Sequence, residues 1–247
     1  MISLHGKRIL VSGASAGIGR ATAILCDSLG ASVIITARNE DLLKEVHSEM
    51  SDRTQYFVAD LTIESEIDAL VNQCETLDGF FHAAGAIQPY PIKYIRKKNI
   101  DHLFNINLNS AILLTSGLIK NKRIKPCSSL VYISSISVDH PYMGGALYSS
   151  SKAALESFSK SVALEFANMK IRSNVVQPAL VETEMFEQTK NAYRDDEFSQ
   201  ILKQYPLGIG KPSDIASAVV FLLSDSSSWI TGTTIKMDGG LLLNSRR

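Results

Sequence analysis

Short runs of apolar and β-branched residues alternate along the chain with longer segments whose apolar residues recur at helical spacing. Seven of the short runs have the length and composition of strands: Arg8–Ser12, Ser32–Thr36, Gln55–Ala59, Gly79–Ala83, Leu130–Ser134, Ile171–Val176 and Thr234–Met237. The longer segments predict helices at Gly19–Leu29, Asn39–Met50, Glu64–Thr76, Ile95–Ile119, Tyr148–Ala167 and Pro212–Leu223. Strands joined through helices form right-handed crossovers, so the pattern predicts a parallel sheet with helices on both faces.

The chain shows no internal repeat and no Pro/Gly-rich linker. A chain of 247 residues with 45% hydrophobic residues is long enough for one sizeable core. We therefore expect an α/β fold in which residues 1–247 form a single domain. Its architecture would be a Rossmann-type, doubly wound parallel sheet of about seven strands flanked by helices.

The segment 182–210 interrupts the alternation. It shows no strand pattern, but aromatic and apolar residues recur in it: Met185, Phe186, Tyr193, Phe198, Ile201, Leu202 and Tyr205. A long insertion that carries its own apolar face usually folds over another part of the molecule. We predict one or two short helices that form a substrate lid over a pocket. The alternative is a surface excursion packed on the body of the domain.

Charge and cysteine content narrow the classes of partner. The chain has 25 basic and 25 acidic residues, a balance that argues against a nucleic-acid or anionic-membrane partner. Its three cysteines form no CxxC pair, which favours a reducing compartment and no thiolate metal site. The amino terminus lacks the apolar core of a secretory signal, and no apolar stretch approaches the ~20 residues that span a bilayer. We expect a cytoplasmic protein without a metal.

The first predicted strand runs into a glycine-rich turn, Ser12-Gly-Ala-Ser-Ala-Gly-Ile-Gly19. A bound dinucleotide needs a tight turn, close approach of the backbone to its pyrophosphate, and a helix N-terminus with free N–H groups. Glycine meets the first two needs because it has no Cβ atom. We therefore predict cofactor contacts from Gly13, Ser15, Gly17, Ile18 and Gly19; an ordinary strand-to-helix turn is the alternative.

The end of the second predicted strand indicates which dinucleotide binds. Cofactors without a 2′-phosphate are usually recognised there by an acidic side chain, but this chain has Thr36-Ala-Arg38-Asn39. A guanidinium can bind a phosphate through paired hydrogen bonds. Arg38 therefore favours NADP(H), with NAD(H) as the alternative should Arg38 only cap a surface loop.

Tyr148 and Lys152 are four residues apart, which places a phenol and an ammonium on one face of a helix. A nearby ammonium stabilises phenolate, so we expect a lowered tyrosine pKa and efficient proton transfer. Tyr94 and Lys98 have the same spacing, and we interpret that pair as an accidental match on an exposed helix. Ser135 distinguishes the two cases, because it follows a buried strand at the sheet edge where such folds bind ligands.

In these features the sequence resembles the short-chain dehydrogenase/reductase family over essentially its whole length. The glycine turn fits the family's TGxxxGxG with Ser12 in place of threonine, and the family's catalytic tetrad is matched in order and spacing by Asn107, Ser135, Tyr148 and Lys152. The resemblance further implies contacts with the cofactor from Asp60, Leu61, Ala84, Gly85, Pro178, Val181 and Thr183, besides Tyr148 and Lys152. Asp238-Gly-Gly240 resembles the family's carboxy-terminal signature.

Three positions depart from the family pattern. His82 replaces an asparagine that steadies the central sheet, so a local hydrogen bond must be made differently. Ala179 replaces a glycine beside the nicotinamide. Ala16 occupies a place where many NADP(H)-dependent members have a basic residue, which leaves Arg38 as the main phosphate ligand.

The resemblance implies a mechanism. NADPH would deliver a hydride to a carbonyl carbon while Tyr148 protonates the oxygen, and the reverse reaction would oxidise an alcohol. Lys152 would lower the tyrosine pKa and bind the nicotinamide ribose. Ser135 would orient and polarise the carbonyl, and Asn107 would hold a water that links Lys152 to solvent.

Within the family, the pattern resembles the 3-oxoacyl-(acyl-carrier-protein) reductase type, whose partner is an acidic acyl carrier protein. Lys120–Lys125 and the pair Lys170 and Arg172 are candidate contacts with such a carrier. Sugar, polyol and steroid dehydrogenases share the pattern and stay open as alternatives. A non-catalytic NADP(H)-binding sensor is the alternative from another class. Family members commonly assemble through the two long helices, so we also expect a homo-oligomer, a dimer or a tetramer.

Overall fold

The parallel sheet predicted from the sequence is present in a computed structural model of the chain, which describes residues 2–190 and 194–244. Its strands are parallel and lie in the order β3-β2-β1-β4-β5-β6-β7. The strands are β1 (Arg8–Ser12), β2 (Ser32–Ala37), β3 (Gln55–Val58), β4 (Leu77–His82), β5 (Ile124–Ile133), β6 (Arg172–Pro178) and β7 (Thr234–Met237). The order reverses between β1 and β4, the point at which doubly wound sheets bind ligands. The predicted fold class is confirmed.

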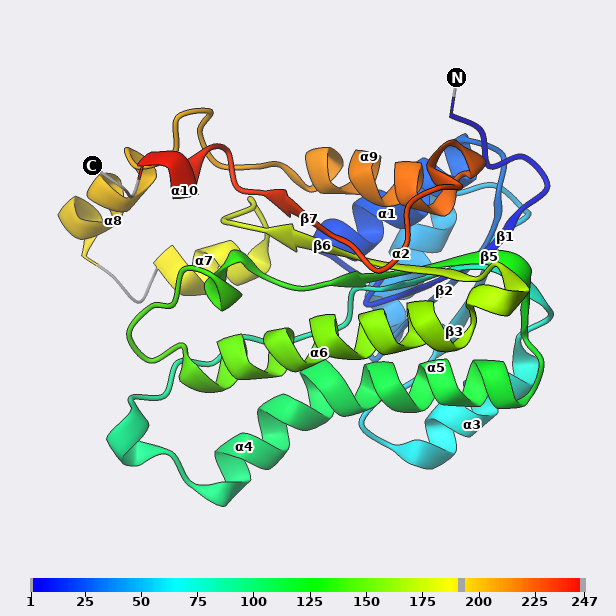
Figure 1. Cartoon of the computed structure of the whole chain (residues 1–247), viewed down its shortest axis with the longest axis horizontal. Coiled ribbons are helices and arrows are strands. Elements are labelled where there is room, and N and C mark those ends of the chain that lie inside the picture. The colour runs from blue at the N-terminus through cyan, green and yellow to red at the C-terminus, as the bar shows by residue number, and fades with distance from the viewer. Residues whose placement is uncertain (1, 191–193, 245–247) are drawn as a thin grey trace.

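Helices cover both faces of the sheet (Figure 1). One face carries α1 (Gly17–Ser28), α2 (Glu40–Ser48) and α9 (Pro212–Leu223). The other face carries α3 (Glu64–Gln73), α5 (Ser110–Lys120) and α6 (Ala146–Glu165), and α4 (Lys97–Phe104) packs beside α6. Each face of the sheet packs into its own hydrophobic core, and adjacent residues of a strand contribute alternately to the two. Ile9 and Val11 lie in the core of the first face, and Leu10 lies in that of the second. This explains the continuous apolar runs in the sequence.

The long helix predicted at Ile95–Ile119 is interrupted. It begins at Lys97, and a π-turn at Asn105–Asn109, which we label η2, separates α4 from α5. Tyr94 belongs to a separate 3₁₀ turn, Ile92–Tyr94. Tyr94 and Lys98 therefore do not share a helix face, and the interpretation of that pair as an exposed helical match was wrong in its geometry.

The segment 182–210 contains two helices, α7 (Glu184–Lys190) and α8 (Asp195–Leu202). They lie beyond the ends of β6 and β7, together with α10 (Leu241–Asn244) (Figure 1). The rings of Phe186 and Phe198 meet edge to face at 5.4 Å, and a bridge between Val181 and Gly210 closes the base of the segment. Tyr193 lies outside the described residues. The short helices agree with the sequence, and the lid function stays a prediction.

Over residues 2–190 and 194–244, no helix has both the length and the apolar character needed to cross a membrane.

Candidate active site

The four residues of the predicted catalytic tetrad meet at the carboxyl edge of the sheet. Ser135 follows β5, Tyr148 and Lys152 lie in the first two turns of α6, and Asn107 lies in η2. Tyr148 is hydrogen-bonded to Ser135. A Cβ atom on Gly85 would lie 3.2 Å from both the Asn107 Oδ1 and the Lys152 Nζ, so these two atoms flank one glycine. The fold therefore assembles the tetrad from segments far apart in the sequence.

Tyr148 is almost fully buried, with 7% of its surface exposed. Burial raises the pKa of its phenol, because a phenolate is poorly solvated in the interior, and the hydrogen bond with Ser135 opposes this effect. The pKa direction is opposite to the lowering expected from the sequence. The spacing of Tyr148 and Lys152 revealed the charge partner but not the desolvation, which depends on tertiary packing.

Lys152 is also buried, and its Nζ donates a hydrogen bond of 2.9 Å to the Ile133 carbonyl. The Nζ lies 5.9 Å from the centroid of the Tyr148 ring. Burial lowers the pKa of the ammonium to about 8. The lysine is therefore still mostly protonated at neutral pH, and its charge is available to a phenolate formed on Tyr148.

Asn107 occupies the centre of η2 and is fully buried. Its Oδ1 accepts a hydrogen bond from the Ala86 N–H at 2.8 Å, and its Nδ2 donates to the Ala86 carbonyl and the Ser151 hydroxyl. The side chain thus ties the segment after β4 to α6. A π-turn inside a helix is frequent at functional sites. The predicted water path from Lys152 past Asn107 stays a prediction.

The glycine turn forms the cradle that a pyrophosphate requires. A Cβ atom on Gly13 would lie 2.6 Å from the Ala84 nitrogen, and one on Gly19 would lie 2.1 Å from the Gly13 carbonyl oxygen. Both glycines are therefore required for the close packing of the turn. The first turn of α1 contains no acidic residue and no side-chain cap, so its N–H groups can face an anion. The residues present fit a dinucleotide.

The other predicted cofactor contacts lie around this turn. Gly17 has φ +53°, and a Cβ atom there would lie 3.1 Å from the Thr183 side chain, which brings the segment after β6 beside the turn. Pro178 ends β6, and the buried Val181 forms the bridge to Gly210. Ser15 is part of the turn itself, and Ile18 is the second residue of α1, with its side chain packed on the first core.

Directly after β2, Arg38 lies 4.0 Å from Asp60, and 66% of the Arg38 side chain is exposed. Partial burial raises the pKa of the Asp60 carboxyl, but the hydrogen bonds from Thr62 and the charge of Arg38 together outweigh burial and hold that pKa below its ordinary value. Leu61 is buried in the second core beneath them. Because the Arg38 side chain is mostly exposed and its ion pair with Asp60 is long, the guanidinium can reach an external phosphate.

One polar contact near the tetrad, that of Glu156, was missed in the sequence. Glu156 accepts hydrogen bonds from the Ser134 hydroxyl at 2.5 Å and from the Gln177 amide at 3.0 Å, which joins α6 to the ends of β5 and β6. Its position four residues after Lys152 was the available signal. The departure at His82, noted from the sequence, is accommodated by hydrogen bonds between its ring and two serine hydroxyls.

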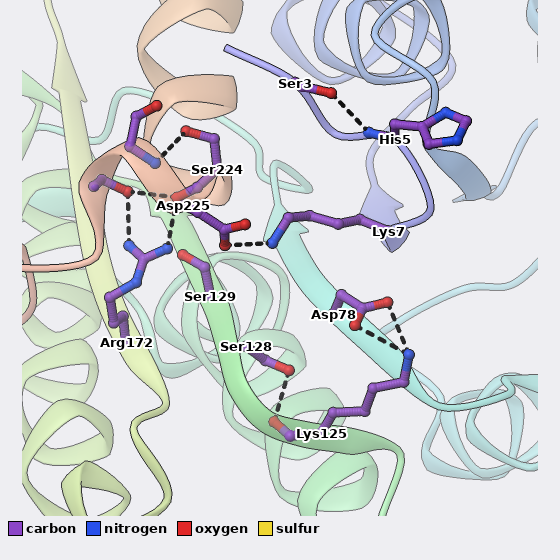
Figure 2. A network of polar contacts seen from close by, with 12 residues as sticks. Ser3, His5, Lys7, Asp78, Lys125, Ser128, Ser129, Arg172, Ser224 and Asp225 are labelled. Carbon is purple, nitrogen blue, oxygen red and sulfur yellow. Dashed lines mark hydrogen bonds and ion pairs between the residues drawn. The ribbon is translucent and has the colours of Figure 1, made fainter. Parts of the chain in front are cut away.

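One of the predicted contacts with an acidic carrier, Arg172, is corrected by the structure. Arg172 is buried, and its guanidinium donates to the Leu222 and Ser224 carbonyls and the Ser227 hydroxyl at 2.8–3.0 Å. Figure 2 shows this cluster beside the ion pair of Lys125 with Asp78. Arg172 is the first residue of β6 and Lys125 is the second residue of β5, so they lie at the amino edge of the sheet, opposite the tetrad. These side chains stabilise the ends of their strands, and the buried Arg172 is not available to a partner protein.

Among the residues that the structure describes, no cluster of three or more His, Cys, Asp or Glu side chains could hold a metal ion.

Comparison with known proteins agrees with this geometry. The profile of a family described as Enoyl-(Acyl carrier protein) reductase matches residues 13–242. The 3-oxoacyl-(acyl-carrier-protein) reductase of Rickettsia bellii is 35% identical over 244 residues, covering 98% of this chain and 100% of the relative. The enzyme of the same name from Salmonella typhimurium is 34% identical over 247 residues, with the same coverage.

Solved structures give the same result. A short-chain dehydrogenase/reductase from Brucella melitensis, titled a glucose/ribitol dehydrogenase, superposes with a TM-score of 0.90 at 27% identity, covering 96% of this chain and 97% of the other. A short chain dehydrogenase family protein from Francisella tularensis gives a TM-score of 0.84 at 30% identity, covering 96% and 99%.

Proposed function

The chain belongs to the short-chain dehydrogenase/reductase family, an NAD(P)-dependent class that acts on carbonyl and alcohol groups, and we propose that it is an NADPH-dependent 3-oxoacyl thioester reductase of the cytoplasm. The acyl group would be carried by an acidic acyl carrier protein. The observation that carries this substrate is the match to 3-oxoacyl-(acyl-carrier-protein) reductases over 98% of this chain and 100% of the relative. The assembled tetrad supports the reaction type.

In the proposed reaction, bound NADPH supplies the hydride. Ser135 donates a hydrogen bond to the carbonyl oxygen of the substrate, and Tyr148 transfers its phenolic proton to that oxygen. The resulting phenolate is stabilised by the Lys152 ammonium, whose position is fixed by its hydrogen bond to Ile133. Asn107 holds Ala86 and Ser151, and through them the two segments that flank Lys152.

The proposed preference for NADPH rests on Arg38. The position after β2 holds an exposed guanidinium where an acidic residue would accept from a ribose hydroxyl. Asp60, at 4.0 Å, is close enough to orient the guanidinium without neutralising it fully. We expect Arg38→Ala to weaken NADPH binding at least tenfold and to leave NADH binding within about twofold, as loss of a charge-assisted phosphate contact implies. Equal losses for both cofactors would contradict this role.

A sugar or polyol substrate is the second candidate, favoured by the likeness to the structure titled a glucose/ribitol dehydrogenase. The test is the initial rate of NADPH and NADH oxidation with an acetoacetyl thioester, ketosugars and a steroid ketone. We expect rapid NADPH oxidation with the thioester alone. Preference for a ketosugar would move the proposal to the second candidate.

Tyr148→Phe separates an enzyme from a cofactor-binding sensor. The variant keeps the ring that packs in the site but loses the proton, so turnover should fall by about 10²-fold or more while the NADPH Kd stays unchanged. Unchanged turnover would refute the catalytic role of Tyr148.

We also propose a homo-oligomer, assembled through α5 and α6. Leu113 on α5 is 40% exposed and Leu164 on α6 is 80% exposed, although both helices pack their buried faces on the sheet. Sedimentation of the purified protein at micromolar concentration should give a species larger than the 27.0 kDa chain. A single species of monomer mass would refute assembly.

A further inference from the structure

His82, the last residue of β4, has both ring nitrogens engaged by serine hydroxyls. Its Nδ1 lies 2.9 Å from the Ser12 Oγ, and its Nε2 lies 3.3 Å from the Ser110 Oγ. The side chain is 1% exposed, and the rings of Phe80 and Tyr132 pack around it at centroid distances of 5.9 and 6.5 Å. The imidazole therefore bridges two elements inside the protein and has no access to solvent.

The direction of each hydrogen bond follows from the serines. The Ser110 hydroxyl donates its one hydrogen to the Ile106 carbonyl at 2.6 Å. It can only accept from the imidazole, so His82 carries its proton on Nε2. The unprotonated Nδ1 then accepts from the Ser12 hydroxyl. One neutral tautomer satisfies every group in the chain Ser12–His82–Ser110–Ile106.

The two ends of this chain lie in different parts of the candidate active site. Ser12 immediately precedes Gly13, whose turn packs against the main chain of Ala84. Ser110 follows the π-turn η2, and the Ile106 carbonyl belongs to the same turn as Asn107. The imidazole therefore joins the cradle of the cofactor to the turn that presents a residue of the tetrad.

We propose that His82 is a positioning residue that holds the glycine turn and the π-turn of Asn107 in register, so that the cofactor and the proton-transfer groups keep a fixed separation. This role rests on the proposed function, because the site it aligns is that of the reductase. The alignment requires a neutral imidazole. Burial, and secondly the charge of Lys152, lower the pKa of His82 to about 3, so the ring keeps its neutral form at physiological pH.

The first test does not depend on activity. In the full-length protein labelled with ¹⁵N-histidine, two-bond ¹H–¹⁵N spectra report the tautomer of each of the five histidines. We expect the signals of His82, assigned by their loss in His82→Asn, to show the Nε2–H tautomer without change from pH 5 to pH 8. An Nδ1–H tautomer, or titration near pH 6.5, would overturn the proposal.

The second test removes the serine hydroxyl at each end of the hydrogen-bond network separately. Ser110→Ala should lower kcat for the acetoacetyl thioester about tenfold and keep the NADPH Kd within twofold. Ser12→Ala should raise the NADPH Kd about tenfold. His82→Leu should show both losses. The double variant Ser12→Ala/Ser110→Ala should lose no more than His82→Leu does, because the effects of residues in one network are not additive. His82→Asn, which keeps a donor and an acceptor, should recover part of the loss.

Ser159→Ala is the matched control. Ser159 on α6 is buried and its hydroxyl is hydrogen-bonded to that of Ser173 at 2.8 Å, away from the tetrad. It loses a buried hydroxyl of the same kind, so it should leave kcat and the NADPH Kd unchanged. Equal effects in Ser110→Ala and Ser159→Ala would reduce His82 to a general stabilising role. If the wild-type protein reduces no thioester, the proposed substrate fails, and the tautomer and the NADPH Kd still decide the role of His82.

Discussion

The buried imidazole of His82 predicts a specific loss of stability in mild acid. The pKa of a histidine in the unfolded chain is about 6.5, and in the folded protein that of His82 is lowered to about 3 by burial and by the charge of Lys152. Between these two values the unfolded state binds a proton that the folded state does not. The contribution of the neutral His82 to stability is therefore fully present above pH 6.5, and it is lost as the pH falls from 6.5 toward 3.

The size of the effect follows from linkage. Each pH unit between the two pKa values changes the free energy of unfolding by about 1.4 kcal/mol for a single group. From pH 6.5 to pH 5, His82 alone should cost roughly 2 kcal/mol, which is a large share of the 5–15 kcal/mol typical of a domain.

Urea unfolding of the wild type and of His82→Asn at pH 8, 7, 6 and 5, at one protein concentration, measures this contribution. Asparagine does not titrate, so the other histidines and the carboxylates cancel in the difference between the two proteins. The variant should gain on the wild type by about 1.4 kcal/mol per unit below pH 6.5, whatever their offset at pH 8. Parallel curves would refute the reasoning, since they would mean that the imidazole takes up its proton in the folded state as readily as in the unfolded one.

Three further predictions concern the site and the opposite edge of the sheet. Because the pKa of Lys152 is about 8, kcat/KM should fall as the pH rises through 8. Lys152→Arg stays protonated, so its pH profile should not show this fall, although its rate should be lower. A fall that persists in the variant would mean that a group other than Lys152 causes it. Gly13→Ala should weaken NADPH binding at least tenfold, because the new Cβ atom would collide with Ala84. Gly6→Ala, at a similar positive φ but in open space, should leave NADPH binding unchanged. Equal effects of the two substitutions would show that backbone strain, and not the contact with Ala84, causes the loss. Arg172→Met should cost roughly 3 kcal/mol of stability, by urea unfolding, and leave kcat unchanged in the folded protein; a changed kcat would connect that edge to the site.

The fold and the position of the site could be predicted because both depend on regular patterns. Apolar runs of strand length, separated by helical segments, allow few topologies once crossovers are right-handed. Residues that follow such strands must meet at one edge, which is why Ser135 and the glycine turn could be placed together from the sequence. The helical spacing of Tyr148 and Lys152 then added the proton-transfer pair to that edge.

The details that were wrong or missed depend on packing that no local pattern records. A π-turn adds one residue to a helix without changing its composition, so Asn105–Asn109 could not be distinguished from its neighbours in sequence. The pKa of Tyr148 was expected to be lowered because its charged partner is visible in the sequence and its burial is not. The basic character of Arg172 indicated a surface contact, but its position at the first residue of β6 places it under α9.

The two edges of the sheet show why residue type alone does not identify function. At the amino edge, Lys125 pairs with Asp78, and the Arg172 guanidinium donates to two backbone carbonyls and a hydroxyl, so these charges stabilise strand ends. At the carboxyl edge, Lys152 is buried without a carboxylate among its hydrogen-bond partners in the described residues, and its pKa is lowered to about 8. A buried charge that lacks a counter-ion costs free energy, and in the proposed reaction a phenolate on Tyr148 would balance that of Lys152. Arg172 and Lys152 both donate to backbone carbonyls, so they are distinguished by their edge of the sheet and by the Tyr148 ring beside Lys152, rather than by residue type.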